Sequence, residues 1–72
     1  MSGRPVKRSL TLKGHRTSVS LEDEFWAAFR DIATQKEIHI NALASEVDAN
    51  RDADVGLASA IRVFILQELK RV

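Results

Sequence analysis

RTSVSLEDEFWAAFRDIA, residues 16–33, decides the fold, because the spacing of its apolar residues changes part-way along it. Residues 16–21 alternate between apolar and polar, which predicts a half-buried strand. One face of that strand holds Thr17, Val19 and Leu21. The opposite face holds Arg16, Ser18 and Ser20. From residue 21 onward, apolar residues recur at helical spacing, so the strand is expected to run directly into a helix.

The first helix is expected to begin near residues 20–21, with Ser20 as its cap, and to continue to about residue 36. A second helix is predicted over residues 40–49. A third is predicted over about residues 56–71, with Asp54 as its candidate cap. The apolar positions that define the strand and the helices are also the candidate dimer core: Val19, Leu21, Phe25, Trp26, Phe29, Ile32, Leu43, Val47, Ile61, Phe64 and Ile65.

The chain is divided into a basic N-terminal arm (residues 1–13), a central unit (residues 14–50), and a linker with a C-terminal apolar helix (residues 51–72). Residues 1–7 are expected to be flexible, because they lack periodicity and contain glycine and proline. Residues 8–13 alternate and form a candidate extra strand. Gly14 then breaks the alternation, which requires a turn or a bulge. No internal repeat is evident along the chain.

Composition excludes several classes of protein. The 72 residues contain no cysteine and two histidines, so we expect neither a metal site nor a cofactor. No signal peptide or membrane-spanning run is recognisable, and we expect a soluble, cytoplasmic protein. There is no catalytic constellation, and we do not expect an enzyme. Charge is uneven: the acid-free residues 1–20 carry +5, whereas residues 21–72 carry −4. Such asymmetry favours contact with a polyanion, the alternative being a disordered leader that aids solubility.

A second copy of the chain is the expected partner. A strand followed by helices leaves backbone groups unpaired unless another strand joins it, and an isolated strand is unstable in water. The third helix is also too apolar for a lone surface helix, so it needs cover. Two copies could pair their strands and intertwine their helices. A monomeric three-helix core is the alternative.

The same residues resemble a known superfamily. Residues 16–33, followed after a short break by HINALASEV (residues 39–47), resemble the ribbon-helix-helix superfamily of Arc- and MetJ-type repressors. The sequence is also similar to a group of short bacterial proteins with a preceding basic stretch such as KRSLTL (residues 7–12) and a further apolar helix. The resemblance implies a mostly α fold with one short strand and a third C-terminal helix. It also implies an intertwined homodimer with an intersubunit antiparallel β-ribbon.

The resemblance implies DNA contacts as well. The family's base-reading positions fall on Arg16, Ser18 and Ser20, whose side chains suit base edges in the major groove. Backbone N–H groups at the start of the second helix would hold a DNA phosphate, as helix N-termini hold anions. The residues at that position are His39, Ile40 and Asn41. The basic residues of the arm are the further candidate phosphate contacts: Arg4, Lys7, Arg8 and Lys13.

Two departures from the family pattern concern the phosphate site. A glycine is common in the break between the helices, where this chain has Glu37 and Ile38. A serine or threonine often caps the second helix, where this chain has His39.

Together these features predict a sequence-specific DNA-binding protein, a transcriptional repressor or autoregulator that binds double-stranded DNA as a homodimer. Two alternatives remain open. One is an antitoxin of a toxin–antitoxin pair, with a protein partner held by the C-terminal helix. The other is a dimerisation or scaffold module that binds no DNA.

Overall fold

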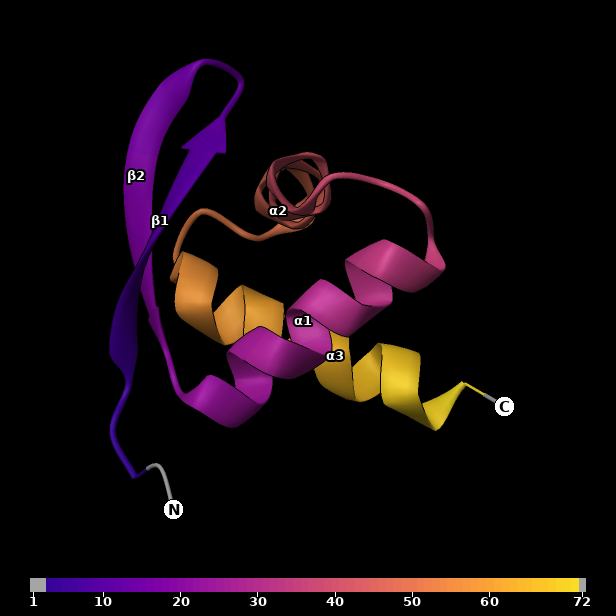
Figure 1. The fold of residues 1–72 in the computed structure, drawn as a ribbon. Helices are drawn as coiled ribbons and strands as arrows, with labels where there is room; N and C mark the ends of the chain where they lie inside the picture. Colours follow the sequence, from indigo (N-terminus) through magenta and orange to yellow (C-terminus); the bar gives the residue numbers. More distant parts are fainter. Residues whose placement is uncertain (1–2, 72) are drawn as a thin grey trace.

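Two strands precede three helices in the computed structural model, which describes residues 3–71. The strands β1 (Val6–Leu12) and β2 (His15–Leu21) form an antiparallel two-stranded sheet. The helices are α1 (Asp23–Gln35), α2 (Ile40–Asn50) and α3 (Leu57–Lys70). The hairpin stands along one side of the molecule and all three helices lie on the other side of it (Figure 1). Among the described residues, no helix has the length and apolar character needed to cross a bilayer.

A two-residue turn joins the strands. Lys13 (φ 51°) and Gly14 (φ 83°) both have positive φ, and they separate the paired residues Leu12 and His15. Turns of this kind match the twist of the strands but require the left-handed region at both central positions, which glycine adopts without strain. The turn also explains why apolar positions change from even to odd numbers at Gly14.

Of the candidate strand at residues 8–13, residues 8–12 are in β1 and Lys13 lies in the turn, and the strand begins earlier than expected. Val6 and Lys7 belong to β1, so the prediction of a flexible segment over residues 1–7 is wrong at these two positions. Met1 and Ser2 lie outside the described residues.

β2 pairs with a strand of its own chain. The prediction placed one short strand in each chain and took the second strand of the ribbon from another copy. In the structure, β1 and β2 of one chain form the ribbon. The physical reason is the short connection, since a two-residue loop costs little closure entropy compared with bringing in a second molecule. The expected order of a ribbon followed by helices is confirmed.

Helix boundaries agree with the sequence pattern, but two caps do not. α1 begins after Glu22, so Ser20 remains in β2 and does not cap the helix. α3 is preceded by Gly56, not by Asp54. Ser20 is still paired with Lys7 in the sheet, and Asp54 lies in a turn in which the Val55 N–H donates to the Asp52 carbonyl oxygen (3.0 Å), so each helix begins further along the chain.

The end of α1 takes a conformation that usually needs glycine. Glu37 has φ 57°, its N–H donates to the Thr34 carbonyl oxygen (3.0 Å), and the Ile38 N–H donates to the Ala33 carbonyl oxygen (3.0 Å). This pair of bonds is the Schellman motif, in which the left-handed residue closes the helix. Glu37 thus occupies the position where the family pattern has glycine.

One chain contains a continuous hydrophobic core that joins the hairpin to all three helices. It contains Leu10, Val19 and Leu21 from the hairpin and eight residues from the helices: Phe29, Ile32, Ala33, Leu43, Ala44, Val47, Ile61 and Ile65. Phe25, Trp26 and Phe64, also predicted as core, are half-buried and pack against it. One face of α3 packs against the core of its own chain, as in the monomeric alternative. Its other side leaves Val63, Leu66 and Leu69 more than half exposed.

Candidate nucleic-acid interface

The hairpin has two chemically different faces. Strand alternation sends one set of side chains toward the helices and the other set toward solvent. On the inner face, Leu10, Val19 and Leu21 are buried. We call the solvent side the outer face; its members, all exposed, form the cross-strand pairs Lys7–Ser20, Ser9–Ser18 and Thr11–Arg16.

The outer face brings together all three sequence-predicted base-contact residues. Arg16, Ser18 and Ser20 lie on one strand of it and point away from the core, as the alternation predicted. The sequence prediction did not include Ser9 and Thr11, which lie opposite them on β1. The alternation at residues 8–13 carried the signal for their orientation. Their pairing with β2 follows only once Lys13 and Gly14 are placed in a tight turn.

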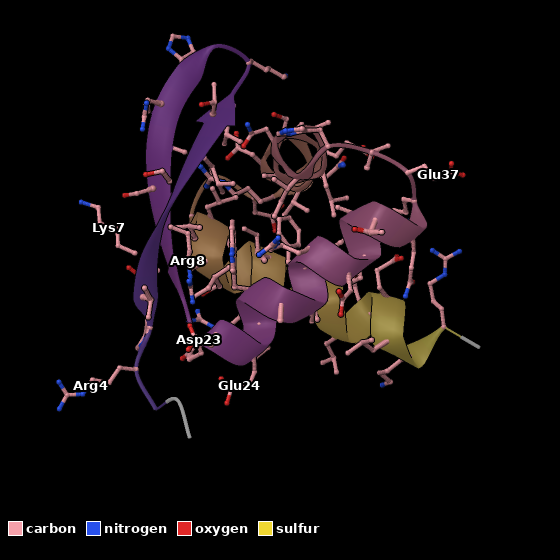
Figure 2. The ribbon with its side chains drawn as sticks, viewed as in Figure 1. Arg4, Lys7, Arg8, Asp23, Glu24 and Glu37 are labelled. Atoms are coloured by element: carbon pink, nitrogen blue, oxygen red, sulfur yellow. The ribbon has the colours of Figure 1, made fainter. Side chains whose placement is uncertain are left out.

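Arg8 lies on the inner face, and this corrects its assignment as a phosphate contact. Its guanidinium forms an ion pair with Asp23 at the start of α1 and donates to the Leu21 carbonyl oxygen (3.3 Å). The same group stacks over the ring of Trp26, 5.5 Å from the ring centre. Figure 2 shows Lys7 directed away from the helices and Arg8 directed toward Asp23. Arg8 therefore fastens the hairpin to α1.

Trp26 serves as packing surface in this arrangement. Its ring is half-buried beneath Arg8 and lies 6.5 Å from the ring of Phe29, measured between centroids. Trp26 therefore packs against the core of its own chain. Cation–π contacts of this kind contribute roughly 0.5–2 kcal/mol, more when the groups are shielded from water.

The N-terminus of α2 adjoins the edge of β1. His39 is the N-cap, and its Nδ1 accepts a hydrogen bond from the Asn41 N–H (3.1 Å). The Asn41 side-chain oxygen accepts from the Thr11 N–H of β1 (3.1 Å). The His39 cap therefore occupies one of the N–H groups predicted to hold phosphate. Among the described residues, the Ile40 and Ala42 N–H groups have no protein acceptor.

A second contact fastens the hairpin to the helices, and the sequence did not reveal it. We call this contact, which joins α3 to the end of β2, the Arg62 clip. The Arg62 guanidinium donates to Glu22 Oε1 through Nη2 (2.7 Å) and Nε (3.2 Å), and Nη2 also donates to the Ser20 carbonyl oxygen (3.3 Å). It stacks over the Phe25 ring, 5.4 Å from the centre. The hydrogen bonds from Arg62 lower the pKa of Glu22 below its ordinary value. The three partners lie about 40 residues away in sequence, which is why no local pattern indicated the contact.

The remaining basic residues flank the outer face. Arg4 precedes β1 and Lys13 lies in the turn, so they mark opposite ends of the hairpin, and both are exposed. His15 is also exposed beside the turn. The sequence contains no acid before Glu22. The hairpin therefore carries positive charge. Among the described residues, Arg8 is the one basic residue of the hairpin that forms an ion pair with a helix.

Comparison with known families identifies this architecture. Residues 5–69, which include both strands and nearly all of α3, match the ribbon-helix-helix domain. Comparison with curated proteins and with solved structures gave no match. Domains of this family are typically non-enzymatic DNA-binding modules that dimerise, and the family points to a DNA-binding regulator. On this match and on its ribbon and helices, the chain belongs to the ribbon-helix-helix domain family.

Proposed function

We propose that this protein is a sequence-specific transcriptional repressor or autoregulator that inserts its hairpin into the major groove of DNA. One observation carries the proposal. The outer face presents six exposed polar side chains, with basic groups and no acidic or apolar group among them. Its inner face is fixed to a packed core. A two-stranded ribbon is narrow enough for the major groove, which is about 12 Å wide.

Arg16 is the principal base contact in this proposal. Its guanidinium offers two parallel N–H donors, which match the O6 and N7 acceptors of guanine. Ser18 and Ser20 lie further along the same strand and are shorter, so they contact bases only where the ribbon lies deep in the groove. A specificity dominated by Arg16 follows.

The phosphate contacts come from the surroundings of the ribbon. The α2 N-terminus lies beside β1, at the end of the ribbon that carries Thr11, and its unpaired N–H groups and helix dipole favour an anion there. The Asn41 amide group lies at the same position. Arg4 and Lys13 supply positive charge at the two ends of the hairpin.

A homodimer remains part of the proposal, on a different surface. The ribbon obtains both strands from one chain, so it does not require a second copy. The exposed apolar residues of α3 are the support for dimerisation: Val63, Leu66 and Leu69. The proposal includes a location in the bacterial cytoplasm, where the DNA target would lie. Light scattering at micromolar concentration should report a dimer, and a monomer at that concentration would remove this part of the proposal.

DNA binding is tested by measuring affinity for genomic DNA fragments over a range of salt concentrations. The affinity should fall steeply, with a log–log slope of about −0.9 for each phosphate neutralised. Arg16→Ala should cost roughly 1–3 kcal/mol on a selected site. Lys70→Ala, at the far end of α3, is the matched control and should leave affinity unchanged. Affinity that is low and independent of salt would favour the scaffold alternative.

A further inference from the structure

β1 and β2 carry the same six-residue pattern. Residues 7–12 read KRSLTL and residues 16–21 read RTSVSL, an offset of nine residues. At corresponding places both have a basic residue, a serine, an aliphatic residue, a hydroxyl residue and a leucine. One place differs, where Arg8 corresponds to Thr17. The linear sequence did not reveal this repeat, because it is short and becomes apparent only when the two segments are recognised as paired strands.

The pairing register converts the repeat into approximate two-fold symmetry. Ser9 pairs with Ser18 at the centre of the outer face. Antiparallel strands are related by a two-fold axis that passes between paired residues, perpendicular to the sheet. An axis through the Ser9–Ser18 pair superimposes Lys7 on Arg16 and Thr11 on Ser20, as the repeat requires. The outer face is therefore chemically symmetric at all of its positions.

The helix contacts on the two edges of the hairpin also lie at positions related by this axis. On β1, the Thr11 N–H is held by the Asn41 side chain of α2. On β2, the Ser20 carbonyl oxygen is held by the Arg62 side chain of α3. Thr11 and Ser20 are symmetry mates, so each edge is clipped at the equivalent place by a different helix. Each edge of the ribbon thus has one side-chain contact from a helix of its own chain.

The symmetry is broken only on the inner face. Arg8 packs against Asp23 and Trp26, whereas its counterpart Thr17 is exposed. Different helices lie beneath the two halves of the hairpin, so the inner face cannot remain symmetric. Nothing in the packing of the chain requires symmetry of the outer face, which contacts solvent. A two-fold ligand provides a reason for it.

We infer that the β1 half of the outer face, Lys7, Ser9 and Thr11, is a second base-reading surface and that one hairpin recognises a short inverted repeat. The inference rests on the proposed function. Duplex DNA has two-fold axes of its own, and a two-fold protein surface makes equivalent contacts with both strands of a palindromic site. Lys7 then occupies the role of Arg16 on the opposite strand, since both side chains donate to guanine.

The spacing of the site follows from the strand. Lys7 and Arg16 are four residue pairs apart along the ribbon. At about 3.3 Å per residue this is roughly 13 Å. It equals about four base-pair steps at 3.4 Å each. The expected site has guanines on opposite strands about four steps apart.

The inference is tested by selecting bound duplexes from a randomised pool with the wild-type protein, Lys7→Ala and Arg16→Ala. The wild type should select the inverted repeat. Each variant should select a single half of it and lose about tenfold in affinity for the full site. Lys13→Ala is the matched lysine control, since a phosphate contact weakens binding to all sequences and leaves the selected motif intact.

The outcomes separate the two proposals. If Arg16→Ala alters the selected motif but Lys7→Ala weakens all sequences equally, the inference is wrong and the proposed function stands. If the wild-type protein selects an asymmetric site, the two-fold reading is also wrong. If no duplex is enriched and binding does not depend on salt, the proposed function itself fails.

Discussion

Lys7 and Arg8 are neighbours in β1, yet they serve opposite faces of the hairpin. Lys7 is exposed on the outer face, opposite Ser20. Arg8 is turned inward, paired with Asp23 and stacked on Trp26. Two basic residues of nearly the same intrinsic character therefore have different surroundings because a strand alternates its side chains. Positive charge in this hairpin is therefore of two kinds: one stabilises the fold and the other is available to a partner.

Because the two faces have different surroundings, substitutions should alter stability and DNA affinity separately. Substitutions on the inner face should lower the free energy of unfolding. Substitutions on the outer face should lower affinity and leave stability within about 0.5 kcal/mol of the wild type, as for most surface changes.

The largest effect is expected from Phe29→Ala. Phe29 is fully buried in the core that supports the inner face, and its ring makes an edge contact with Phe64 at 6.1 Å between centroids. Removing a buried aromatic ring costs roughly 3–5 kcal/mol. Urea unfolding measures the loss, with Ser18→Ala on the outer face as the control. Equal stability of the two variants would contradict the division between the faces.

Arg8→Ala tests whether the inward-facing Arg8 stabilises the fold. The substitution removes the contact with Trp26 and the charged hydrogen bonds, so the free energy of unfolding should fall by roughly 1–3 kcal/mol. Lys7→Ala is the matched control and should leave it nearly unchanged. Within residues 3–71, the buried Arg8 Nε has no hydrogen-bond partner. Arg8→Met, which keeps the apolar stem, should therefore recover part of the loss. Full stability of Arg8→Ala would show that Arg8 does not fasten the hairpin.

A smaller effect, of opposite sign, is expected at the end of α1. Glu37 has φ 57°, in the left-handed region that costs a residue with a Cβ roughly 1–2 kcal/mol. Glu37→Gly removes this strain and should raise the free energy of unfolding by about 0.5–1 kcal/mol, part of the gain being offset by the entropy of glycine. Glu37 lies far from the outer face (Figure 2), so DNA affinity should not change. A destabilised variant would show that the Glu37 side chain contributes more than its backbone costs.

The smallest effect concerns pH and the clip that holds the end of β2. Hydrogen bonds from Arg62 lower the pKa of Glu22 below its ordinary value of 4.5. A carboxyl whose pKa is depressed on folding contributes stability that is present above its unfolded-state pKa and lost as pH falls through the folded-state pKa. Wild-type stability should therefore decline below about pH 4.5, and Arg62→Ala should reduce the part of the decline due to Glu22. Identical dependence of stability on pH in the two proteins would show that the Arg62–Glu22 contact does not stabilise the fold.

The sequence alone determined what depends on neighbouring residues. The alternation of residues 16–21 predicted which face Arg16, Ser18 and Ser20 occupy, and the helical spacing predicted all three helices to within a few residues. These features follow from local backbone geometry, in which side chains repeat every two residues in a strand and every 3.6 in a helix.

The tertiary structure decided which segments meet. Alternation shows that a strand needs a partner, but a second chain and a segment two residues upstream satisfy its backbone equally well. The pairing with β1 depends on the Lys13–Gly14 turn. This turn brings the two halves of the repeat into register. The contact from Arg62 to Glu22 and Ser20 spans about 40 residues. Such contacts result from packing the whole core, where burial and connectivity are settled together, and no window of sequence contains them.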